Sequence, residues 1–266
     1  YPWINEKLGI VNTPYWGMEH QTIIAYGNEY KDNERGYDFL LLHEMAHEWW
    51  GNYLSVGDWS DFWIHEGFAV YSEALFIEEK FGVGEYNSFF KKNLLKKIPQ
   101  YKPIVLNRNA TMKQVAGLDP YYKGAFVLHM LRYLIGDEDF FKVIKEFLHS
   151  KKKAPDNQVS TSDFIDIVHN TIGENIDWFF KVYLYEKKYP ILIKEINHGS
   201  NHTFVELSWK NKGFSMPVEV FYKSNTGFTQ KKLVITNEPT MIAIPQYNQI
   251  KIDPDKRILL TLDKKE

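Results

Sequence analysis

The spacing of apolar residues changes once along this chain, near residue 189. Before that point, apolar positions recur three and four residues apart, which predicts amphipathic helices. Two early stretches, residues 7–12 and 21–26, predict strands instead. The predicted helices cover residues 36–52, 59–81, 84–98, 119–135, 137–150, 161–171 and 176–187. The first part of the chain is therefore expected to be mainly helical with a small sheet.

Beyond Tyr189 and Pro190 the period falls to two, and turn residues separate the alternating stretches. The clearest of these stretches are residues 204–209, 218–222 and 232–235. About seven short strands at this spacing predict a small antiparallel β-sandwich. We therefore expect an α+β protein, with a catalytic or binding domain at 1–188 and a sandwich at 189–266. A sandwich alone implies no chemistry.

Composition narrows the classes of function. The chain has 266 residues, 44% hydrophobic and 25% charged, which is the balance of a globular protein. A net charge of −2 gives no reason to expect a nucleic-acid partner. No run of about 18 apolar residues occurs, so no membrane span is expected. The chain has no cysteine, so any metal must be held by histidine and carboxylate. Nothing in the sequence assigns a compartment.

Residues 43–47 read HEMAH and lie inside the first predicted helix. Residues four apart on a helix lie one turn apart on the same face, so His43 and His47 can reach one ion. Zinc accepts nitrogen and oxygen ligands in a tetrahedron. The pentapeptide therefore predicts a zinc site, whereas two partly exposed histidines on an amphipathic helix are the alternative that needs no metal.

A third ligand is available from the next predicted helix. Glu66 lies early in residues 59–81, and this helix must fold back beside the first. Two histidines and one carboxylate leave the fourth position of a catalytic zinc ion to water. Glu44 leans toward the metal without room to be a ligand, and there it can take a proton from that water. We expect one Zn²⁺ ion on His43, His47 and Glu66, with Glu44 as general base.

The chain resembles the gluzincin aminopeptidases, the family that includes aminopeptidase N and leukotriene hydrolase. The resemblance spans essentially the whole chain and rests on four segments. These are GMEH (17–20), HEMAH (43–47), WIHEGFAVYSE (63–73) and YYKG (121–124). It implies a thermolysin-like zincin domain followed by the β-sandwich, and hydrolysis of the N-terminal residue of peptides.

The first of these segments has a physical role in such an enzyme. The α-amino group of a peptide has a pKa near 7.7–8.0 and is largely a cation at neutral pH. A carboxylate at a fixed distance from the metal can hold that cation, and by resemblance this carboxylate is Glu19. An edge strand here could pair with the substrate backbone, with amides around Gly17 facing its carbonyl. Met18 and Trp16 are expected beside the pocket for the first residue.

The last segment offers a hydrogen-bond donor. Attack on the scissile carbonyl builds negative charge on its oxygen, which a donor and the metal can stabilise together. By resemblance this donor is the tyrosine two residues before the lysine, which is Tyr121 and not Tyr122. A helix that begins at Asp119 and Pro120 would place Tyr121 in its first turn.

Three residues depart from the pattern of the family. His20 and His65 stand where the family usually has asparagine, and Trp16 stands where it has glycine. His65 adjoins a predicted ligand, but neighbours on a helix point about 100° apart, so only Glu66 should face the metal. Glu73, two turns further along, is expected either at the surface or in a hydrogen bond to a ligating histidine.

Two alternatives to an aminopeptidase remain open at this stage. The same metal and base suit a zinc endopeptidase or a hydrolase of another electrophile. A catalytically silent metal-binding fragment is the third reading. The chain starts without methionine and lacks the N-terminal β-rich domain that closes one wall of the cleft in the family. We therefore expect a piece of a longer protein that binds zinc and peptides with free N-termini but turns over weakly or not at all.

Overall fold

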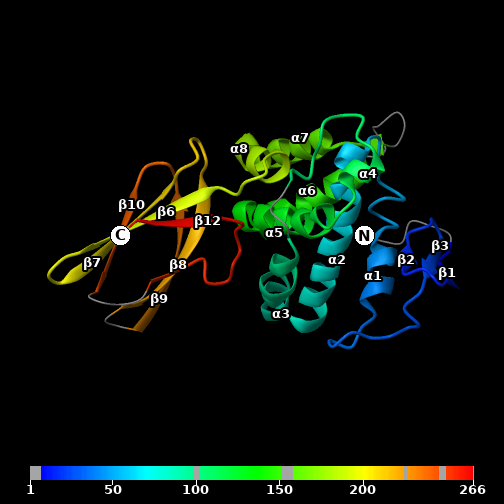
Figure 1. Cartoon of the computed structure of the whole chain (residues 1–266), viewed down its shortest axis with the longest axis horizontal. Coiled ribbons are helices and arrows are strands. Elements are labelled where there is room, and N and C mark those ends of the chain that lie inside the picture. The colour runs from blue at the N-terminus through cyan, green and yellow to red at the C-terminus, as the bar shows by residue number, and fades with distance from the viewer. Residues whose placement is uncertain (1–6, 99–101, 151–157, 225–226, 246–249, 266) are drawn as a thin grey trace. The chain divides into compact units, whose positions relative to one another are not determined.

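The computed structural model (Figure 1) has two compact units, Tyr1–Asn175 and Ile176–Glu266, which are described separately. The description covers residues 7–98, 102–150, 158–224, 227–245 and 250–265. Within these residues, none of the helices combines the length and apolarity needed to cross a bilayer.

The first unit opens with a small three-stranded sheet. Its strands are β1 (Gly9–Asn12), β2 (Gly17–Met18) and β3 (Ile23–Tyr26). β3 lies in the centre, parallel to β1 and antiparallel to β2. The predicted strands at 7–12 and 21–26 are confirmed, but β3 is not an edge strand. The edge strand next to Glu19 is β2. This strand has only two residues, which are too few to show an alternating pattern, so the sequence did not predict it.

Helix α1 (Phe39–Ala46) follows, and Asp38 caps its N-terminus by accepting a hydrogen bond from the backbone N–H of Leu41. The helix is shorter than the predicted 36–52. His47 is its C-cap but keeps α-helical dihedral angles, so it stays one turn from His43. Leu40 packs beneath the sheet against Ile24.

The chain then turns back into η1 (Trp59–Asp61) and α2 (Trp63–Phe81), as the predicted helix 59–81 required. Helix α2 is the centre of the first unit and is buried along most of its length, with Trp63, Phe68 and Ile77 in the core. In Figure 1, α2 lies between α1 and α5.

The other predicted helices of the first unit are present, but their winding varies, and the short helix Met112–Val115 was not predicted. Residues 84–98 form an α-helix, a π-helix and a 3₁₀ turn in succession, and residues 119–135 begin as a π-helix. The elements are α3 (Val83–Ser88), η2 (Phe89–Leu94), η3 (Leu95–Lys97), α4 (Met112–Val115), η4 (Asp119–Lys123), α5 (Gly124–Ile135), α6 (Asp137–Ser150), β5 (Gln158–Val159) and α7 (Thr161–Ile172). β5 pairs with β4 (Ser55–Val56).

The second unit contains the predicted sandwich. One sheet has the order β10-β7-β6-β12 and the other β11-β8-β9. The strands are β6 (Ile191–His198), β7 (His202–Trp209), β8 (Met216–Ser224), β9 (Gly227–Ile235), β10 (Thr240–Pro245), β11 (Ile250–Ile252) and β12 (Thr261–Lys265). The pairing is antiparallel except that β12 runs parallel to β6. Local alternation cannot specify that exception.

The helical turns α8 (Asp177–Phe180) and η6 (Lys181–Tyr185) belong to the sandwich unit by their contacts. Tyr183 donates a hydrogen bond to the carbonyl of Leu259 and its ring lies 6.0 Å from that of Phe214. The chain therefore divides into compact units between residues 175 and 176, whereas the hydrophobic period changes near 189. The predicted domain boundary between residues 188 and 189 was based only on this change in hydrophobic period.

Candidate metal centre and active site

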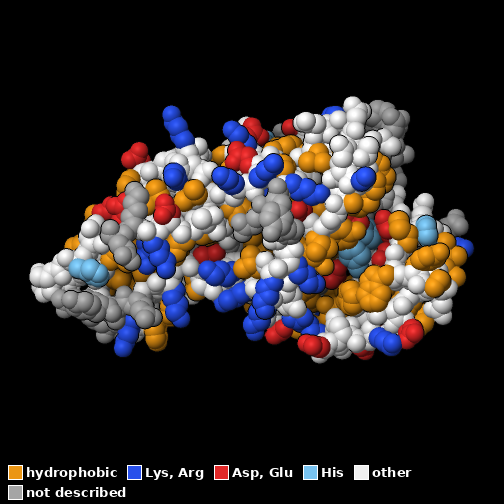
Figure 2. All heavy atoms as spheres, viewed as in Figure 1, with side chains coloured by type: hydrophobic (Ala, Val, Ile, Leu, Met, Phe, Trp, Pro, Cys, Tyr) orange, Lys and Arg blue, Asp and Glu red, His pale blue; other side chains and the backbone are white. Residues whose placement is uncertain are grey.

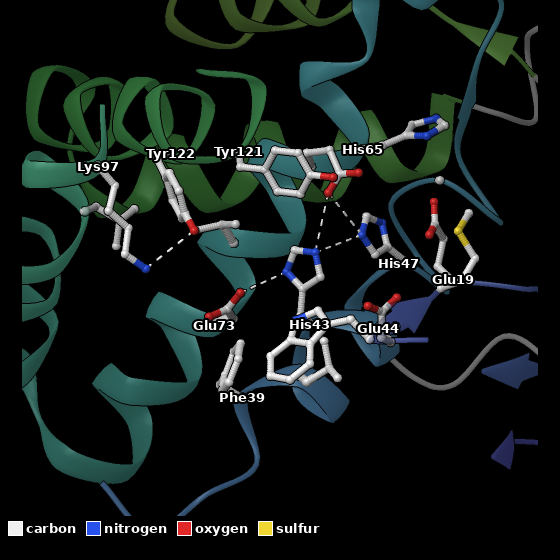
Figure 3. A pocket seen from close by; sticks show the side chains of 18 of the residues that line it. Glu19, Phe39, His43, Glu44, His47, His65, Glu73, Lys97, Tyr121 and Tyr122 are labelled. Carbon is white, nitrogen blue, oxygen red and sulfur yellow. Dashed lines mark hydrogen bonds and ion pairs between the residues drawn. The ribbon is translucent and has the colours of Figure 1, made fainter. Parts of the chain in front are cut away.

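The three predicted ligands meet at one point between α1 and α2 (Figure 3). The Nε2 atoms of His43 and His47 lie 3.2 Å apart. Each of them lies 3.4 Å from Oε2 of Glu66. The structure thus brings together two histidines from one helix and a carboxylate from the next.

This spacing fits a zinc ion. Zinc–nitrogen and zinc–oxygen bonds of about 2.0–2.1 Å in a tetrahedron place neighbouring ligand atoms roughly 3.3–3.4 Å apart. Oε2 of Glu66 is buried and accepts no regular hydrogen bond. A buried acceptor in this position is satisfied by a cation. The donor set of two imidazoles and one carboxylate leaves a tetrahedral position for water.

Both histidines are held by contacts on the far side of their rings. Nδ1 of His43 lies 2.9 Å from Oε1 of Glu73, and Nδ1 of His47 lies 2.8 Å from the carbonyl of Trp50. An acceptor at Nδ1 keeps the proton there and turns the lone pair of Nε2 toward the centre. Glu73 is therefore buried and hydrogen-bonded to a predicted ligand, whereas the contact of His47 with Trp50 was not predicted.

Glu66 and the two histidines shift one another's pKa values. Burial alone would raise the pKa of Glu66, but the imidazole rings of His43 and His47, each 3.4 Å away, lower it to about 2. Burial lowers the pKa of His43, but its contacts with Glu66 and Glu73 raise it well above its usual value. These contacts therefore favour a proton on His43 in the metal-free state, and a metal ion bound at the same point competes with that proton.

Glu44 lies beside this cluster, with a carboxylate oxygen within 4.8 Å of a ring nitrogen of His47. It is almost fully buried, and burial raises the pKa of its carboxyl to about 7. Gly17 of β2 approaches it closely: a Cβ atom at position 17 would lie 2.3 Å from Oε1 of Glu44. Only glycine at position 17 leaves the carboxyl of Glu44 where it is.

Glu19 follows β2 and lines the same cavity as the ligands. Its backbone carbonyl accepts a hydrogen bond of 2.8 Å from the side-chain amide of Asn52, which lies just beyond α1. Figure 3 shows the carboxyl of Glu19 on the side of His47, with Glu44 next to it. Glu19, Glu44 and His47 also form a second close group of possible ligands, but it shares His47 with the first.

Tyr121 lies in the first turn of η4, as predicted from Asp119 and Pro120. Its ring stacks beside that of His43, with centroids 6.1 Å apart and planes 16° apart. Burial and the charge of Glu66 raise the pKa of its hydroxyl above the usual value of 10. The hydroxyl of Tyr121 is thus neutral and can donate a hydrogen bond next to the three predicted ligands.

A close crossing of backbones places η4 against α2. A Cβ atom at Gly67 would lie 2.9 Å from the Cα atom of Gly124. These glycines follow Glu66 and the YYK segment directly, so the crossing sets the position of Tyr121 relative to a ligand. The sequence analysis did not predict this close approach, although Gly67 and Gly124 both lie in segments that it singled out.

His65 points away from the cluster, as the helical angle predicted. Its Nε2 atom accepts a hydrogen bond of 3.1 Å from the backbone N–H of Val56. Burial lowers the pKa of His65 to about 4, so it is neutral. It holds the start of α2 to β4, which leaves Glu66 as the predicted ligand.

All eight predicted site residues line one cavity of about 920 Å³. They are Gly17, Met18, Glu19, His43, Glu44, His47, Glu66 and Tyr121. Figure 2 shows histidine side chains at the bottom of an open recess in the first unit, with carboxylates and apolar side chains around them. An open recess of this size admits a peptide chain.

A HExxH helix with its third ligand, a glutamate, on the following helix defines a gluzincin metal centre. The family described as "Peptidase family M1 domain" matches residues 12–183. The chain belongs to this family.

Curated relatives show the same relationship at low identity. The chain is 26% identical to "Aminopeptidase M1" of Arabidopsis thaliana over 188 residues, which is 67% of this chain and 21% of the relative. It is 30% identical to "Endoplasmic reticulum aminopeptidase 2" of Homo sapiens over 118 residues, which is 41% of this chain and 12% of the relative. The chain therefore spans about a fifth of the length of such relatives or less.

Solved structures share the fold. Aminopeptidase A of Legionella pneumophila, crystallised with aspartic acid, superposes with a TM-score of 0.76 at 18% identity, over 97% of this chain and 32% of that one. The M1 zinc metallopeptidase of Deinococcus radiodurans gives a TM-score of 0.58 at 24% identity, over 71% of this chain and 41% of that one. These likenesses establish the α+β fold.

Proposed function

We propose that this chain is the catalytic part of a zinc aminopeptidase, which hydrolyses the N-terminal residue of peptides. The observation that carries the proposal is the set of three ligand atoms at 3.2–3.4 Å, with Glu44 and Glu19 on the same cavity. Membership of the M1 family and the names of its aminopeptidase relatives support it.

His43, His47 and Glu66 would hold one zinc ion. When bound, zinc lowers the pKa of a water molecule to about 7 and polarises a carbonyl group. The three side chains keep one tetrahedral position open for this purpose. Glu73 and the carbonyl of Trp50 fix the two imidazole rings so that the position stays where Glu44 can reach it.

Glu44 is the general base. Its pKa of about 7 lets the carboxylate accept a proton from the attacking water and return it to the leaving amine near neutral pH. Gly17 packs directly against the carboxyl of Glu44. In the proposal Glu44 moves protons, while His43, His47 and Glu66 hold the metal.

Tyr121 and Glu19 act on the substrate. The hydroxyl of Tyr121 donates a hydrogen bond to the carbonyl oxygen on which negative charge develops. Glu19 holds the α-ammonium of the substrate, while the edge of β2 at Gly17 and Met18 faces the first residue. A peptide with a free N-terminus is therefore the substrate class, and a further domain of the parent protein is expected to complete the cleft.

Capture of the amine separates this proposal from a zinc endopeptidase. The zinc-loaded protein, or its longer parent if turnover of the chain is weak, is given alanine p-nitroanilide and its N-acetyl derivative. We expect cleavage of the free amine only, and loss of that cleavage in Glu19→Ala. Equal cleavage of both compounds, or internal cleavage that survives Glu19→Ala, would instead indicate an endopeptidase. Bound zinc without turnover of any substrate would indicate a silent module.

A further inference from the structure

One wall of the cavity is formed by the irregular segment η2–η3. Phe89, Asn93 and Lys97 recur at every fourth position of this segment and all three line the cavity. The ammonium of Lys97 lies 3.4 Å from the hydroxyl of Tyr122 and 4.8 Å from the centre of its ring. Because Tyr122 directly follows Tyr121, an exposed cation is held on the wall next to the proposed oxyanion donor.

This wall lies on the leaving-group side of the site. Figure 3 shows Glu19 and Lys97 on opposite sides of the two ligating histidines. If Glu19 holds the N-terminus, as proposed above, and the first peptide bond lies at the ligands, the rest of the peptide runs toward Lys97. This step rests on the proposed function.

Lys97 also differs from the other cation on the cavity wall. Arg35 lies 3.4 Å from a carboxylate oxygen of Glu85 and 3.4 Å from the amide oxygen of Asn93. Lys97 forms no ion pair with any carboxylate of the described residues. Its neighbours Lys91, Lys92 and Lys96 are exposed on the same segment and add positive potential. Figure 2 shows Lys and Arg side chains gathered over this region.

We propose that Lys97 is a specificity residue that binds a carboxylate of the substrate beyond the scissile bond. A lysine ammonium on a flexible stem is a point charge that suits a single carboxylate. Two sources can provide that carboxylate: an acidic side chain directly after the scissile bond, or the free C-terminus of a short peptide. The proposed substrate class is therefore short or acidic peptides.

The test measures binding, so that it does not depend on turnover. The dissociation constants of four dipeptides are measured by NMR titration of the zinc-loaded chain in a Glu44→Gln background. Ala-Ala is compared with Ala-Ala-NH₂, and Ala-Asp-NH₂ with Ala-Asn-NH₂. In at least one pair we expect the acid to bind roughly 3- to 10-fold more tightly, the range for an exposed charge-assisted contact. The pair that shows the preference identifies the source of the carboxylate.

Two variants complete the experiment. In Lys97→Gln the preference should fall to near one, whereas Lys96→Gln removes the same charge from an exposed neighbour outside the cavity and should retain it. The inference is overturned if neither pair differs, if the preference survives Lys97→Gln, or if Lys96→Gln abolishes it equally. Release of alanine by the protein with Glu44 tests the proposed function separately, and its absence does not alter the binding ratios.

Discussion

Glu44 and Gly17 show how single residues define the reaction site. The carboxyl of Glu44 is buried next to two histidines, and its pKa of about 7 reflects that burial. Any side chain at position 17 would occupy the space of its Oε1 atom. The carboxyl of Glu44, the proposed base, can therefore keep its position only if residue 17 has no side chain. The site requires a glycine at position 17 as well as a glutamate at position 44.

Replacing the base should separate catalysis from metal binding. In Glu44→Gln the side chain keeps its shape but cannot accept a proton, so we expect kcat to fall roughly 10²- to 10⁴-fold. Zinc content, measured by elemental analysis, should stay at the level of the unchanged protein. Loss of zinc from this variant would contradict the role assigned to Glu44.

Orientation of the ligands should be visible in metal affinity. Glu73→Ala removes the acceptor at Nδ1 of His43, and loss of such a contact typically weakens metal binding about 10- to 100-fold. The zinc dissociation constant is measured by competition with a chromophoric chelator. Glu79→Ala, an exposed glutamate on the same helix, is the matched control and should leave the constant unchanged. Equal effects of the two substitutions would argue that Glu73 has no special role.

Two of the elements that carry these residues, α2 and η4, approach each other closely at the backbone. Gly67 of α2 and Gly124 at the start of α5 leave no room for a Cβ atom between them. Helix α2 brings Glu66 to this crossing and η4 brings Tyr121. The distance between α2 and η4 therefore sets the geometry of the site.

The crossing can be tested by stability. Gly67→Ala places a methyl group 2.9 Å from the backbone of Gly124, and overpacking of this kind typically costs about 1–3 kcal/mol. Gly84→Ala is the control: it lies in α3, where a Cβ atom meets nothing within 4 Å, and alanine should stabilise a helix by about 0.5–1 kcal/mol. Thermal unfolding of the zinc-loaded proteins should lower Tm for the first and raise it for the second. A Tm for Gly67→Ala at or above that of the parent would mean that the helices can move apart freely.

Sequence alone predicted the parts of the site that depend on local spacing. His43 and His47 meet because residues four apart share a helical face, even though α1 ends before His47. The folding back of α2 was also required by Glu66. The contact of His47 with the carbonyl of Trp50, the π-helical winding of η4 and the crossing at Gly67 were not predicted. These features arise from tertiary packing, which cannot be predicted from the spacing of apolar residues along the chain.

At the scale of the whole molecule, the proposed metal centre should couple folding to pH. All three proposed ligands come from residues that only the folded chain brings together, so zinc binding stabilises the folded state. The same residues hold a proton when zinc is absent, because Glu66 and Glu73 raise the pKa of His43. Protons and zinc therefore compete for one site, and both act on the free energy of unfolding.

The sign of this competition predicts how zinc stabilisation depends on pH. Because the folded pKa of His43 is raised, its proton stabilises the metal-free fold below about pH 6.5, and that contribution is lost as the pH rises through the raised value. The increase in Tm caused by zinc should therefore be small near pH 6 and grow toward pH 8. At a pH where free zinc is about 100 times its dissociation constant, zinc should raise the free energy of unfolding by roughly 2.7 kcal/mol. Calorimetry of the metal-free and zinc-loaded chain at fixed free zinc measures it, with His47→Ala as the variant in which zinc should have little effect. A zinc-dependent increase that stays constant or shrinks as the pH rises would show that no proton is displaced, and the assignment of His43 as a ligand would have to be abandoned.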